Sequence, residues 1–139
     1  MNRVQTRHVV LCVDDEPMVL RSLSRSLARE PYELLMTGSP DTALGWVKAR
    51  DISLVISDQR MPQGSGAALL EQVRQLSPTT ARIVLTGFPW WTAAILRIRL
   101  TAERLFPKPW DDRSLRQAIR EVLRERELRH LEEIELLKE

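Results

Sequence analysis

Five polar side chains of the kinds that handle metal ions and phosphoryl groups stand at or just after the ends of short apolar runs. They are Asp14, Asp15, Asp58, Thr86 and Lys108. Three carboxylates close together would repel one another and raise at least one pKa, unless a hard divalent cation neutralised them, and Mg²⁺ is the cation we expect. An aspartate carboxylate can attack a phosphoryl group directly, while a lysine, a hydroxyl and a metal ion stabilise charge on the phosphoryl oxygens. Asp58, Lys108 and Thr86 could supply those parts.

The apolar runs themselves have the composition of buried strands, and each interval between them can hold a helix. The runs are His8–Val13, Tyr32–Met36, Ile52–Ser57, Ala81–Thr86 and Arg104–Phe106. Pro17 and Pro40 stand where the first turn of a helix tolerates proline, and Ser39 can cap the second helix. Near-continuous apolar strands suit a parallel sheet covered on both faces. We therefore predict an α/β fold with a doubly wound sheet of five parallel strands, in which ligands bind beyond the carboxyl ends of the strands.

The end of the chain is predicted to add a long helix to this fold. From Asp112 to Glu139 there is no glycine or proline, and the segment reads as one long helix. We divide the chain into a core domain over residues 1–123 and a helical extension over residues 124–139. The extension is either a solvated linker helix or one partner of a coiled coil, and the sequence leaves both readings open.

Composition narrows the classes of function. A chain of 139 residues with 43% apolar content can bury one core of ordinary size. Since no run approaches the roughly eighteen apolar residues of a membrane span and residues 1–8 lack the apolar core of a signal peptide, we expect a cytoplasmic protein with no membrane partner. A net charge of +2 gives no strong basic field, so we expect no direct binding of nucleic acid. Cys12 lies in an apolar run, where we expect a buried, unreactive thiol.

Taken in order, the polar residues and their neighbours resemble the receiver domains of two-component response regulators, over residues 9–123. The resemblance is carried by Asp14-Asp15, Asp58 with Met61-Pro62 and Gly66, Leu85-Thr86-Gly87, and Lys108-Pro109. It implies a flavodoxin-like receiver fold and a Mg²⁺-dependent transfer of a phosphoryl group from a sensor histidine kinase or phosphotransfer protein onto Asp58. It also implies that Asp15 and Asp58 bind Mg²⁺ directly, that Asp14 acts through metal-bound water, and that the backbone carbonyl of Arg60 completes the protein ligands.

The resemblance further implies a switch. Lys108 would pair with the phosphate, and Thr86 would move toward it, shifting the face formed by the fourth and fifth helices. A homodimer through that face is one expectation, and Leu96 and Leu100, on the polar side of the fourth helix, would contact a partner or else be ordinary exposed leucines. The motifs are also similar to those of receivers fused to cyclic di-GMP phosphodiesterase or other signalling output domains.

Two features depart from the family pattern. Receivers usually place an aromatic residue three before the lysine, but Leu105 holds that position and Phe106 follows it. Strand alternation would point these two side chains to opposite faces of the sheet, which puts the usual coupling of threonine and aromatic in doubt. The second departure is the run of large side chains in Phe88-Pro89-Trp90-Trp91, directly after the Thr-Gly pair. Because Arg60 and Phe88 hold the positions that gate the hydrolytic water in the family, we predict slow dephosphorylation.

Two other functions compete with the receiver reading. A phosphatase with an aspartyl-phosphate intermediate would need a second aspartate two residues after the first, whereas Gln59-Arg60 follows Asp58. We therefore do not expect an enzyme beyond a domain that catalyses its own phosphorylation and dephosphorylation. The remaining alternative is a degenerate receiver that acts as a docking or dimerisation module without phosphorylation.

Overall fold

The predicted parallel sheet is present in the computed structural model, which describes residues 7–61, 64–87 and 102–138. The five parallel strands lie in the order β2-β1-β3-β6-β7. Their bounds are β1 Val9–Val13, β2 Glu33–Thr37, β3 Leu54–Asp58, β6 Ala81–Thr86 and β7 Arg104–Pro107. Each overlaps its predicted apolar run, and the doubly wound α/β fold is thereby confirmed. Two short strands that the sequence did not suggest, β4 (Arg60–Met61) and β5 (Gly64–Ser65), pair in antiparallel fashion after β3.

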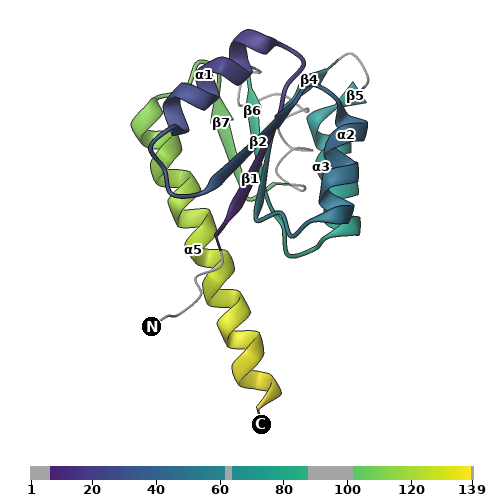
Figure 1. The fold of residues 1–139 in the computed structure, drawn as a ribbon, viewed down its shortest axis with the longest axis vertical. Coiled ribbons are helices and arrows are strands. Elements are labelled where there is room, and N and C mark those ends of the chain that lie inside the picture. Colours follow the sequence, from purple (N-terminus) through teal and green to yellow (C-terminus); the bar gives the residue numbers. More distant parts are fainter. Residues whose placement is uncertain (1–6, 62–63, 88–101, 139) are drawn as a thin grey trace.

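Helices cover both faces of this sheet. Their bounds are α1 Pro17–Leu27, α2 Pro40–Ala49, α3 Gly66–Leu76 and α5 Asp112–Leu137. Figure 1 shows α1 and α5 on one face and α2 and α3 on the other. Pro17 and Pro40 both open their helices as predicted, and the Ser39 hydroxyl accepts a hydrogen bond from the backbone N–H of Thr42. The sandwich of helices therefore begins where the local signals placed it.

Alternate residues of the strands build two separate cores. On β1, Val9 and Leu11 pack toward α2 and α3, whereas Val10 and Cys12 pack toward α1 and α5. Cys12 is fully buried, as expected, and burial raises the pKa of its thiol to about 12. Because strand side chains alternate between faces, every central strand is apolar on both sides.

The same alternation settles the direction of the two residues that depart from the family pattern. On β7, Leu105 packs against the α2/α3 core and Phe106 packs against the α1/α5 core. The prediction that they point to opposite faces is confirmed. The aromatic ring of Phe106 lies on the face covered by α1 and α5, and Leu105 lies on the face covered by α2 and α3. The predictions on Phe88-Pro89-Trp90-Trp91, Leu96 and Leu100 lie outside the described residues.

Helix α5 is one continuous helix, as predicted, and it continues past the body of the domain (Figure 1). Its last buried side chain is Leu123. Beyond it, Leu128 is 46% exposed, Leu131 57% and Leu137 86%. The division into residues 1–123 and 124–139 remains a prediction, as does pairing of the extension with another chain. None of the described helices is both long enough and apolar enough to cross a membrane.

Polar contacts hold α5 against the amino ends of the strands. The Arg126 guanidinium donates to the Thr79 carbonyl oxygen over 2.8 Å and pairs with the Asp51 carboxylate over 3.1 Å. Next to it, Glu127 contacts His8 over 2.8 Å, and the other ring nitrogen of His8 lies 2.9 Å from the Ser53 hydroxyl. The helix is thus fixed to segments just before β1, β3 and β6.

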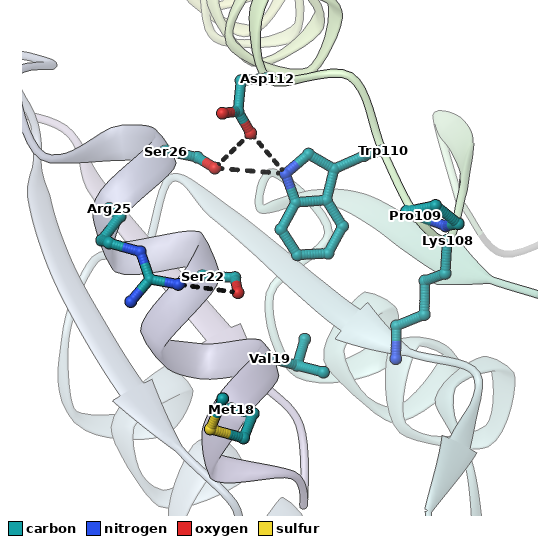
Figure 2. A pocket seen from close by; sticks show the side chains of 9 residues that line it. All are labelled: Met18, Val19, Ser22, Arg25, Ser26, Lys108, Pro109, Trp110 and Asp112. Atoms are coloured by element: carbon teal, nitrogen blue, oxygen red, sulfur yellow. Dashed lines mark hydrogen bonds between the residues drawn. The ribbon is translucent and has the colours of Figure 1, made fainter.

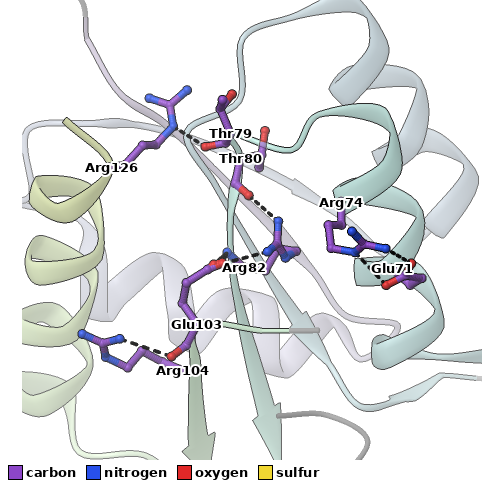
Figure 3. A network of polar contacts seen from close by, with 8 residues as sticks. All are labelled: Glu71, Arg74, Thr79, Thr80, Arg82, Glu103, Arg104 and Arg126. Carbon is purple, nitrogen blue, oxygen red and sulfur yellow. Dashed lines mark hydrogen bonds and ion pairs between the residues drawn. The ribbon is translucent and has the colours of Figure 1, made fainter. Parts of the chain in front are cut away.

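A second polar network joins the start of β7 to its neighbours (Figure 3). The Glu103 carboxylate accepts from the backbone N–H of Arg82 and pairs with the Arg82 guanidinium over 3.3 Å. Burial raises the pKa of Glu103. Arg104 pairs with Glu125 of α5 over 2.9 Å. These contacts fix β7 between β6 and α5, and with it the lysine that follows the strand.

Candidate functional site

The five predicted site residues lie at one edge of the sheet. Asp14 and Asp15 follow β1, whereas Asp58 and Thr86 are the last residues of β3 and β6, and Lys108 follows β7. Because the strands are parallel, their carboxyl ends meet at the same edge. Asp14, Asp58 and Thr86 are buried, whereas Asp15 is exposed. The structure therefore brings together side chains that are up to 94 positions apart in the sequence.

Three of these residues form an acidic cluster. Asp14, Asp15 and Asp58 each offer a carboxylate oxygen, and these oxygens lie within 4.8 Å of one another. Burial raises the pKa of Asp14 and the charge of Asp58 adds to the rise, although hydrogen bonds from the Glu16 backbone N–H and from Lys108 oppose it. Oxygen donors at this spacing, with an excess of negative charge and partial burial, fit a hard divalent cation such as Mg²⁺.

Lys108 bridges two of the carboxylates. Its ammonium group lies 2.8 Å from Asp58 Oδ1 and 3.1 Å from Asp14 Oδ2. Burial disfavours the charged form of Lys108, but hydrogen bonds and charge from the two aspartates outweigh it, and the pKa is raised. The backbone N–H of Lys108 donates to the Thr86 carbonyl oxygen over 2.9 Å, which ties the lysine to the end of β6.

A small cavity of about 290 Å³ opens beside this bridge. Its walls are formed by Glu16, Asp58, Gln59, Arg60, Thr86, Gly87 and Lys108. The lining of this cavity includes the predicted acceptor Asp58 and three other predicted site residues, Arg60, Thr86 and Lys108. Its lining also includes Glu16, Gln59 and Gly87, which the sequence analysis did not predict as site residues. Adjacency to the motifs was the available signal, since each of the three directly follows a predicted site residue.

The backbone of Asp58 lies unusually close to Gly66, the first residue of α3. A Cβ atom on Gly66 would lie 2.3 Å from the Asp58 carbonyl oxygen and 3.0 Å from the Gln59 Cα. The Gly66 N–H donates to the Gln59 carbonyl, and the Gln59 side chain accepts from the Ala67 N–H. The amino end of α3 therefore packs directly against the residue that carries the candidate nucleophile, and only glycine leaves room for it.

A second, larger cavity of about 600 Å³ lies on the other side of Lys108 (Figure 2). Residues of α1 form one wall, and the loop from β7 to α5 forms the other. Within it, the Trp110 indole N–H donates to Asp112 Oδ1 over 3.0 Å and lies 3.3 Å from the Ser26 hydroxyl oxygen. The Ser26 hydroxyl in turn donates to Asp112 Oδ1 over 2.5 Å. These three side chains join α1 to the loop that carries Lys108.

Comparisons with known proteins agree with this arrangement. The model of the response regulator receiver domain matches residues 10–120. The hydrogenase transcriptional regulatory protein HoxA of Bradyrhizobium diazoefficiens is 30% identical over 82% of this chain and 24% of its own length. The transcriptional regulatory protein GlrR of Escherichia coli is 30% identical over 82% of this chain and 26% of its own length. The chain thus spans about a quarter of the length of these relatives.

Solved structures give the same result. The signal receiver domain of an HD domain-containing protein from Pseudomonas fluorescens superposes with a TM-score of 0.86 and 32% identity, covering 94% of this chain and 96% of that one. A structure described as adenylate cyclase from Rhodopirellula baltica gives 0.85 and 29%, covering 96% and 99%. With the receiver model matched over most of the chain and the strand-end residues gathered at one edge of the sheet, this chain belongs to the response regulator receiver domain family.

Proposed function

We propose that this chain is a phosphoacceptor receiver domain, which takes a phosphoryl group from a sensor histidine kinase or phosphotransfer protein onto Asp58 in a Mg²⁺-dependent reaction. The observation that carries the proposal is the placement of the Lys108 ammonium 2.8 Å from Asp58, inside the cluster of three carboxylates. An aspartate so placed has a cation beside it to balance the charge of an incoming phosphoryl group.

The chemical step is a direct displacement at phosphorus. A carboxylate oxygen of Asp58 forms a bond to phosphorus as the bond from phosphorus to the donor breaks, and the donor leaves with the electron pair of that bond. Asp15 and Asp58 would hold Mg²⁺ directly, with Asp14 acting through water and the Arg60 carbonyl oxygen as a further ligand. Bound there, the ion would neutralise charge on the phosphoryl oxygens.

Lys108 and Thr86 would act on the phosphorylated form. Both line the cavity beside Asp58, so an ammonium group and a hydroxyl group border the space that a phosphoryl group on Asp58 would enter. Their pairing with the phosphate would alter the end of β6 and shift the face formed by the fourth and fifth helices. This is a two-state switch that changes an output or dimerisation face. Since Phe106 packs on the face away from Leu105, we propose that the switch works without an aromatic residue at the usual position.

Mass spectrometry of the intact protein tests the proposal directly. The chain is incubated with Mg²⁺ and acetyl phosphate, beside the Asp58→Asn variant and beside wild type with a chelator. We expect an adduct of about 80 Da, the mass added when a phosphoryl group replaces a proton, only on wild type with Mg²⁺. An adduct of equal yield on Asp58→Asn would contradict the assignment of the acceptor.

The competing docking-module function gives a different result in the same assay. A degenerate receiver would show no adduct with acetyl phosphate and none with a panel of purified histidine kinases. The three carboxylates, the threonine and the lysine are all present at the described site, which favours phosphorylation over docking alone.

A further inference from the structure

The contacts of Trp110 bear on how Lys108 is held. Two residues separate Lys108 from the helix-capping Asp111, and this short loop is tied to α1 through the Trp110 indole, the Ser26 hydroxyl and the Asp112 carboxylate (Figure 2). The Asp112 oxygen accepts from both the indole N–H and the Ser26 hydroxyl. The three groups therefore form a closed set of hydrogen bonds between two elements, which we call the Ser26–Trp110–Asp112 contact.

Both elements joined by the Ser26–Trp110–Asp112 contact are adjacent in sequence to residues of the proposed phosphorylation site. Helix α1 begins at Pro17, directly after the acidic residues, and the backbone N–H of Glu16 donates to Asp14 Oδ1 over 2.9 Å. On the other side, Trp110 stands two residues after Lys108. The contact thus connects the element that follows Asp14 to the loop that bears its cationic partner.

A lysine side chain depends on such support. Its four-carbon stem is flexible, so the place of its ammonium group is set by where the backbone stands and by what the ammonium contacts. On the strand side, the Lys108 N–H is fixed to the Thr86 carbonyl. On the helix side, the described polar contacts to α1 are those of Trp110 in the loop and of Asp112 and Arg116 in the first turns of α5, where the Arg116 guanidinium donates to the Ser26 carbonyl oxygen over 3.0 Å.

We propose that Trp110, through its hydrogen bonds to Ser26 and Asp112, is a positioning residue that sets the place of the Lys108 ammonium between Asp14 and Asp58. The inference rests on the proposed phosphorylation of Asp58, for which Lys108 supplies positive charge. Trp110 touches neither the acceptor nor the cavity beside it, and it acts through the loop. Loss of its N–H lets the loop move away from α1, so the ammonium group spends less time at the reacting oxygens.

The decisive variants keep the packing and remove the hydrogen bonds. Trp110→Phe retains an aromatic ring in the α1/α5 core but has no N–H, and Ser26→Ala removes the partner on α1. The matched control is Asp111→Ala, which removes the neighbouring helix cap, an acceptor for the Ser114 N–H, without touching the contact. A general weakening of this end of α5 would appear equally in the control.

Two readouts are measured on the full chain. The first is the rate of Asp58 phosphorylation at saturating Mg²⁺ as acetyl phosphate is varied, together with the Mg²⁺ dissociation constant. We expect both variants to lower the maximal rate about threefold to tenfold, the range set by one lost hydrogen bond, with Mg²⁺ affinity held within about twofold. The second is the NMR cross-peak of the Lys108 ammonium, assigned with Lys108→Arg, which we expect to broaden in both variants and to persist in Asp111→Ala.

The outcomes separate the two proposals. If wild type itself is not phosphorylated, the proposed function fails, while the ammonium cross-peak still reports whether Trp110 positions Lys108. If wild type is phosphorylated and both variants keep its rate and its cross-peak, the positioning role is refuted. A loss of Mg²⁺ affinity by the same factor as the rate would also refute it, because that pattern indicates a disordered site rather than a displaced lysine.

Discussion

Replacing Gly66 by alanine should destabilise the domain, although the same change normally favours a helix. The new Cβ atom would lie 2.3 Å from the Asp58 carbonyl oxygen, a distance that real Cβ atoms essentially never show, and 3.0 Å from the Asp58 carbonyl carbon, which is also unusually close. All the atoms it meets belong to the backbone, so no side chain can rotate away. Overpacking of this kind costs about 1–3 kcal/mol, while the change from glycine to alanine in a helix returns about 0.5–1 kcal/mol.

Because the methyl group meets backbone atoms, the cost lies toward the upper end of that range, and the expected result is a net loss of about 1–2.5 kcal/mol, measured as a lower urea midpoint with an unchanged slope. In a domain of this size, each kcal/mol shifts the melting temperature by about 3–4 °C, so Tm should fall by about 3–10 °C. The matched control is Gly45→Ala in α2, where a Cβ atom would meet nothing within 4 Å. That variant should gain about 0.5–1 kcal/mol.

The displaced atoms also belong to the proposed phosphoacceptor. If the backbone moves to admit the methyl group, Asp58 moves with it, and phosphorylation by acetyl phosphate should slow more in Gly66→Ala than in Gly45→Ala. A Gly66→Ala protein as stable as Gly45→Ala would refute the reasoning, because it would mean that α3 does not pack against Asp58 as closely as 2.3 Å requires.

Three further predictions follow from the site and from α5. Mg²⁺ at ten times its dissociation constant should stabilise wild type by about 1.4 kcal/mol, and thermal melts of Asp15→Asn should show little of this gain. Burial raises the pKa of Asp14 above 3.8, so the folded chain binds that proton more tightly, and the stability this group contributes is present below pH 3.8 and lost as the pH rises through the folded value. In buffer without Mg²⁺, Asp14→Asn should therefore raise the urea midpoint at pH 7, with the gain shrinking toward pH 4; a lower midpoint at pH 7 would contradict this. Truncation after Leu123 should cost about 1–2 kcal/mol more than truncation after Glu127, because only the shorter chain lacks the contacts to the strand starts, and equal urea midpoints would show that those contacts add nothing.

The sheet was predictable because each of its strands corresponds to a short apolar run in the sequence. The run Val9–Val13 is apolar throughout, which indicates burial on both faces, and the proline signals at Pro17 and Pro40 depend on local geometry alone. The opposite directions of Leu105 and Phe106 followed from strand alternation. The short pair β4 and β5 was missed because strands of two residues carry no periodic pattern.

Much of the candidate site could also be anticipated, since parallel strands bring their carboxyl ends to one edge. What could not be anticipated are contacts that depend on side-chain placement between distant segments. The Trp110 indole meets Ser26 across 84 positions, and His8 meets Glu127 across 119. The need for glycine at position 66 likewise depends on how closely α3 approaches β3, a distance that no local pattern encodes.

The contact between His8 and Glu127 places the point where the chain enters the folded core beside the point where α5 leaves it. Both points lie at the amino ends of the strands, whereas the acidic cluster lies at the carboxyl ends, a strand length of about 17 Å away. The segments through which the chain enters and leaves the folded core therefore lie at the same end of the domain. A domain joined before His8 or after Glu127 would therefore be attached at the end opposite Asp58, so the attachment itself would not cover the acidic cluster.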